Sequence, residues 1–150
     1  MPDSNANTEL LRTLERSVSD LIDVFAVNAP PVPVERMLQD PRPGMWREID
    51  ISQISTGFLK ITSPYSPRMS LARFLARMIA QCEWGQARGV PSMNDDVIVF
   101  QQFARMIVMP ARMIKELRPD ARTPQIMSAY FEVPEEDVRR RLEDLIRYSA

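Results

Sequence analysis

The chain has 150 residues, of which 45% are hydrophobic and 26% charged, so it is long enough and apolar enough to bury the core of one globular domain. Its 19 basic and 20 acidic residues leave a formal net charge of −1, which gives no overall attraction to nucleic acid or acidic membranes. The chain contains no histidine and one cysteine, Cys82, which excludes the usual histidine and cysteine ligand sets of zinc.

The organisation expected from this composition is a single domain over residues 1–150. Residues 1–7 are polar and are expected to be disordered. No apolar stretch reaches the roughly 18 residues that a membrane span requires, and the N-terminus lacks the basic and apolar pattern of a signal peptide. We therefore expect a soluble, cytoplasmic protein.

The first third of the chain has the apolar spacing of a long helix and then of strands. Apolar residues recur every three or four positions from Leu10 to Phe25, after a candidate N-cap at Asn7 or Thr8, and a short helix is expected over 32–38. After a turn at 40–44, the segments 45–51 and 57–62 alternate apolar and polar residues. This alternation predicts a small antiparallel sheet, and hence an α+β fold.

Two helices are expected in the middle of the chain. The first runs over 67–84 after the candidate N-cap Ser66, and places Arg73 and Arg77 together on the flank of its apolar stripe. The second runs over 94–109. Its apolar run at 97–100 predicts a helix that is buried nearly all round.

The last third is expected to be a helical bundle. Helices are predicted over 110–117, over 125–131 after the N-cap Thr123, and over 134–148, so that residues 122–148 form a C-terminal helical subregion. The last helix is expected to turn four apolar side chains inward: Val138, Leu142, Leu145 and Ile146.

The stretch from Arg68 to Arg77 resembles the active-site helix of the ImmA/IrrE family of zinc-dependent peptidases and regulators, R-F-(T/S)-L-A-H-E-x-G-H. The matching residues are Arg68, Ser70, Leu71 and Ala72. The two ligand histidines fall on Arg73 and Arg77, and the catalytic glutamate falls on Phe74. Arginine stays protonated and offers only donors, so it repels a cation.

A second stretch resembles the family's E-x-x-A-N-x-F-A-x-x-L-L-M-P. Phe103-Ala104 and Met109-Pro110 match, whereas the third zinc ligand falls on Val97. Further matches, among them Phe131 and Leu142, extend the resemblance over about residues 8–148. The resemblance implies a degenerate zincin-like domain without metal, cofactor or peptidase activity. Arg73, Phe74, Arg77 and Val97 would be vestigial metal-site positions.

Active relatives act on helix-turn-helix repressors, so the resemblance implies a regulatory, protein-binding module whose partner is a protein such as a repressor. Self-association is left open. The alternative is a DNA-binding regulator that uses the helices over 123–131 and 134–148 as a helix-turn-helix, although interspersed acidic residues argue against phosphate contact. An enzyme of different chemistry is the least favoured class, because no phosphate loop or activated nucleophile is present.

Several features have two interpretations at this level. Arg73 and Arg77 either bind an anion or partner, or pair with acids such as Glu83, Asp95 or Asp96. Asp95-Asp96 suggests a metal site or a helix cap, and the run 139–141 suggests a nucleic-acid contact or an ion-paired helix face. Cys82 is a nucleophile or a buried small hydrophobe.

Overall fold

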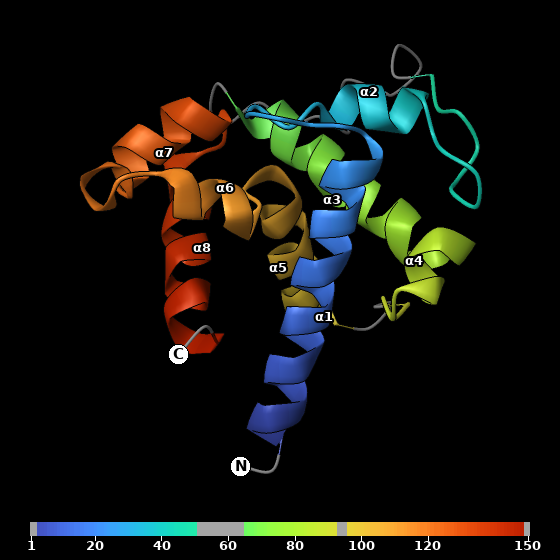
Figure 1. The fold of residues 1–150 in the computed structure, drawn as a ribbon, viewed down its shortest axis with the longest axis horizontal. Helices are drawn as coiled ribbons and strands as arrows, with labels where there is room; N and C mark the ends of the chain where they lie inside the picture. The colour runs from blue at the N-terminus through green and yellow to red at the C-terminus, as the bar shows by residue number, and fades with distance from the viewer. Residues whose placement is uncertain (1–2, 51–64, 93–95, 149–150) are drawn as a thin grey trace.

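The computed structural model describes residues 3–50, 65–92 and 96–148, and every regular element within these ranges is a helix (Figure 1). In chain order they are α1 (Asp3–Val24), α2 (Val34–Gln39), α3 (Ser66–Gln81), α4 (Glu83–Ala87), α5 (Val97–Val108), α6 (Ala111–Glu116), the 3₁₀ helix η2 (Pro119–Ala121), α7 (Pro124–Phe131) and α8 (Glu135–Tyr148). Helix α5 is central, because it packs against α1, α3 and α8. Helix α2 packs on α3, and α7 packs on α8.

One core forms where the apolar stripes of these helices meet. Leu14 and Leu21 of α1, Leu75 of α3, and Phe103 and Met106 of α5 are all fully buried. Leu14 and Leu21 are seven residues apart and Phe103 and Met106 are three apart, so each pair lies on one face of its helix, as the sequence indicates. The core therefore fixes α3 beside α5, which is the relationship that positions the candidate site.

The expected α+β fold is wrong for the part of the chain that the structure describes, since it contains no strand. Residues 46–50 have no regular structure. The backbone N–H of Ile49 and the indole Nε1–H of Trp46 both donate to the carbonyl oxygen of Leu38, each over 3.1 Å. The apolar residues of this segment thus pack beside the end of α2 and not in a sheet. The second expected strand, 57–62, lies outside the described residues.

The expected positions of the helices are otherwise close to those observed, with two differences. Helix α1 begins at Asp3, earlier than the predicted cap. The predicted helix over 67–84 is divided at Cys82, whose extended backbone (φ −104°, ψ 162°) ends α3 and precedes α4. A Cβ atom at Gly85 would lie 1.9 Å from the carbonyl oxygen of Ile79, so only glycine allows this close approach of α4 to the end of α3.

Candidate functional site

Three of the four positions that the resemblance assigns to a former metal site lie together on α3. Arg73, Phe74 and Arg77 line a small cavity of about 150 Å³ with Ser70 and with Phe100 of α5. Arg73 Nη2 donates to Ser70 Oγ over 3.1 Å, and the guanidinium carbon of Arg77 lies 5.5 Å from the centre of the Phe100 ring. Among the described residues, neither arginine forms an ion pair with an acid. The expected partner Asp95 lies outside that part of the chain.

The fourth position, Val97, does not line this cavity. Val97 and Ile98 are 64% and 70% exposed, so the expectation of a helix buried nearly all round is wrong for the first turn of α5. It is confirmed over residues 102–108, all of which are buried. Only Val99 of this first turn of α5 is fully buried. The carboxylate of Asp96 caps the turn by accepting a hydrogen bond from the Val99 N–H over 3.0 Å, which confirms the capping interpretation for Asp96.

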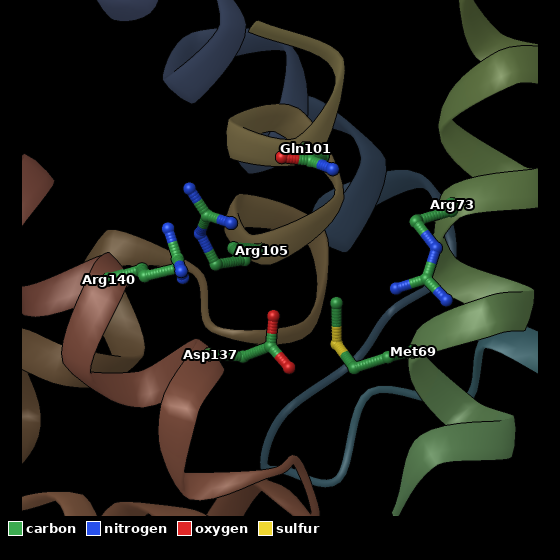
Figure 2. A pocket seen from close by; sticks show the side chains of 6 residues that line it. All are labelled: Met69, Arg73, Gln101, Arg105, Asp137 and Arg140. Carbon is green, nitrogen blue, oxygen red and sulfur yellow. The ribbon is translucent and has the colours of Figure 1, made fainter. Parts of the chain in front are cut away.

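A second cavity, of about 240 Å³, lies between α3, α5 and α8. Figure 2 shows its lining: Met69 and Arg73 from α3, Gln101 and Arg105 from α5, and Asp137 and Arg140 from α8. Arg73 thus lines both cavities. Three arginines from three different helices and one aspartate line the same space.

Arg105 is the most deeply buried of these arginines, with 7% of the residue exposed. Its Nη2 donates to Asp144 Oδ2 of α8 over 3.3 Å, while its buried Nε has no hydrogen-bond partner among the described residues. The sequence analysis missed Arg105. A single charge inside the apolar run from Phe103 to Met109 was the available indication, because such a charge must be paired when the helix is central.

Asp137 is the acidic group of the second cavity. Burial raises the pKa of its carboxyl above the ordinary value of 3.8, and Glu136 acts in the same direction. The positive charges of Arg105, Arg73 and Arg140 oppose this rise in pKa but do not cancel it. Burial and cations therefore act on Asp137 in opposite directions, and burial is the stronger effect.

The arginine run on α8 divides into two kinds of residue. Arg139 and Arg140 are exposed and pair with Glu135 and Glu136, as expected for an ion-paired helix face. Arg141 is instead 1% exposed and lies in the core. Ile146, which was expected to point inward, is 76% exposed, whereas Val138 is buried and Leu142 and Leu145 pack against the core as expected. The inward face of α8 also carries the buried charges of Arg141 and Asp144.

Cys82 is half-buried and packs against the core, and its Sγ contacts the Ile79 carbonyl oxygen at 3.4 Å. Within the described ranges, no group of three or more histidine, cysteine or acidic side chains is arranged to hold a metal ion. No helix of the described chain is both long and apolar enough to cross a membrane.

Comparison with family models, curated proteins and solved structures found no match to this chain. The resemblance to the ImmA/IrrE family therefore stays a prediction that rests on the motif residues alone.

Proposed function

We propose that this chain is a non-catalytic, regulatory protein-binding module related to the ImmA/IrrE peptidases and acting in the cytoplasm. The partner would bind at the α3–α5 face, defined here as Arg73, Phe74, Arg77, Val97 and Phe100. The observation that carries the proposal is the clustering of two arginines and two phenylalanines around one cavity, where Arg77 lies over the Phe100 ring and neither arginine has an acidic partner among the described residues.

The composition of the α3–α5 face is that of a protein interface. Arginine and aromatic residues are enriched in interfaces and supply most residues whose removal weakens binding strongly. Val97, exposed one turn before Phe100 on α5, adds an apolar contact. A partner with acidic and apolar side chains would complement this face, and a helix-turn-helix repressor is the candidate that the family resemblance suggests.

The binding proposal is tested by titrating the purified chain into a purified helix-turn-helix repressor and measuring the heat of binding. Arg77→Gln and Val97→Asp should each weaken binding at least about tenfold, the effect of losing 1.4 kcal/mol. Arg139→Gln is the matched control, because it removes an exposed arginine from α8 without touching the face. Equal affinities for Arg77→Gln and Arg139→Gln would reject this face as the binding surface.

The non-catalytic part of the proposal has its own test. Elemental analysis of the purified chain should give sub-stoichiometric zinc, and incubation with the same repressor should leave the repressor uncut. Stoichiometric zinc with cleavage would mean that Arg73, Arg77 and Val97 do not correspond to the zinc ligands of the family.

The DNA-binding alternative is less well supported by the surface of α8. Its two exposed arginines, Arg139 and Arg140, are engaged by Glu135 and Glu136 on the same helix. Carboxylates at these positions would repel DNA phosphates. Binding to duplex DNA that falls steeply with salt concentration would nevertheless favour this alternative.

A further inference from the structure

The cavity between α3, α5 and α8 brings together three arginines and one acidic residue. Its three arginines come from separate helices that the core holds together, and all three line a common space of about 240 Å³; Figure 2 shows Arg105 and Arg140 together on one side of it and Arg73 on the other. Arg105, the buried member, has an unpartnered Nε among the described residues. This Nε is shielded from solvent, so a ligand in the cavity would act on Arg105 through the charge of its guanidinium group.

Most of the charged side chains at this cavity are already in ion pairs, and the charge that remains depends on the protonation of Asp137. Arg105 is paired with Asp144, and Arg140 with Glu136, whereas Arg73 contacts only the neutral hydroxyl of Ser70 among the described residues. The remaining acid in the wall is Asp137. When Asp137 is protonated, the positive charge of Arg73 is unbalanced. The protonated carboxyl of Asp137 can then itself donate a hydrogen bond.

We propose that this cavity binds one carboxylate group, held by Arg73, Arg105 and Arg140. The planar guanidinium groups match the two oxygens of a carboxylate. A phosphate dianion fits less well, because Asp137 in the wall repels a second negative charge. The inference deepens the proposed function, on which it rests for its context, by giving the chemistry of the partner group: an acidic side chain.

Binding of a carboxylate is coupled to protonation of Asp137. The bound negative charge would lie beside this carboxyl and raise its pKa beyond the rise that burial already causes. The charged groups that act on Asp137 are Arg73 of α3, Arg105 of α5, and Glu136 and Arg140 of α8. Affinity for a carboxylate should therefore fall as the pH rises and Asp137 loses its proton.

The test follows the Nε–Hε resonance of Arg105 by ¹H–¹⁵N NMR while sodium acetate replaces sodium chloride at constant ionic strength. The resonance should shift saturably in the wild type and in the control Arg139→Gln. Arg73→Gln and Arg140→Gln should weaken acetate binding at least about fivefold. In Asp137→Asn the affinity should depend less on pH than in the wild type.

Two further probes test whether the bound group is the side chain of a partner protein and whether it is a carboxylate or a phosphate. A glutamate blocked at both its amino and carboxyl ends should compete with acetate if a partner side chain enters the cavity, and exclusion of this probe would overturn the link to a partner. Inorganic phosphate that bound more tightly than acetate at pH 7.5 would overturn the carboxylate assignment.

Failure of this inference and failure of the proposed function are separable. An unchanged Arg105 resonance, or equal acetate affinity in Arg73→Gln and Arg139→Gln, would reject the carboxylate site even if repressor binding depended on Arg77. Saturable acetate binding together with no repressor binding would support the site and reject the function.

Discussion

Arg141 of α8 and Glu15 of α1 form a bidentate ion pair between the last and first helices of the chain. Its distances are 2.6 Å for Nη1–Oε2 and 3.0 Å for Nη2–Oε1. Arg141 is 1% exposed, and its Nε also donates to the carbonyl oxygen of Met109 over 3.0 Å. One side chain therefore joins the first helix, the last helix and the end of α5. Because the ion pair is almost fully buried, each member stabilises the fold only as long as the other is present.

Removing Arg141 should destabilise the protein strongly. Arg141→Met leaves the Glu15 carboxylate without its main cation, and we expect a loss of about 3 kcal/mol in the free energy of unfolding. The measurement is urea denaturation followed by circular dichroism. Glu15→Met combined with Arg141→Met should cost at least about 1 kcal/mol less than the sum of the single changes. Arg139→Gln should change stability by no more than about 0.5 kcal/mol, and additive single changes would show that the pair is not coupled.

Gly85→Ala should disrupt the junction of α3 and α4. The new Cβ would meet the backbone carbonyl of Ile79, which cannot move aside as a side chain could, so we expect a loss of about 2–3 kcal/mol in urea denaturation. Gly44→Ala is the comparison, because a Cβ there meets its nearest atoms at 3.8 Å and the cost arises only from φ of +84°. That cost is about 1 kcal/mol. Equal losses at the two glycines would contradict the close approach.

Glu132→Gly should stabilise the protein. Glu132 ends α7 in the left-handed conformation, with φ 57° and ψ 56°, which glycine adopts without the steric penalty of a Cβ. Glycine also adds conformational entropy to the unfolded chain, which offsets part of the effect. The expected net gain is about 0.5 kcal/mol in the free energy of unfolding, measured by urea denaturation. Glu132→Ala, which keeps the penalty, should show no gain. A gain of the same size for alanine would attribute the effect to the lost carboxylate.

Asp137→Asn should change how stability depends on pH. The carboxyl of Asp137 has a raised pKa in the folded protein, so the folded state holds this proton more tightly than the unfolded state. Stability relative to the asparagine variant should therefore fall as the pH rises from the ordinary carboxyl pKa of 3.8 through the raised value, and then level off. Urea denaturation at a series of pH values measures the difference in slope. Parallel curves for the two proteins would contradict the raised pKa.

The sequence determined most of the helices by itself. Thr123 before Pro124 predicted the start of α7, and its Oγ1 accepts the Ile126 N–H over 3.3 Å. The regular spacing of Leu14, Val18 and Leu21 predicted the buried face of α1. These features are local, since a cap or an amphipathic stripe depends on residues within one or two turns.

Tertiary packing decided what local pattern could not. The alternation at 45–50 resembles a strand, but Ile49 and Trp46 find their acceptor at Leu38 on α2. Arg139 and Arg141 are near neighbours in one charged run, yet only Arg141 is buried, because Glu15 lies opposite it on α1. The second cavity likewise depends on three helices that are distant in sequence. Spacing along a helix fixes which side chains share a face, whereas the identity of the facing helix decides whether a charge there finds a partner or borders a cavity.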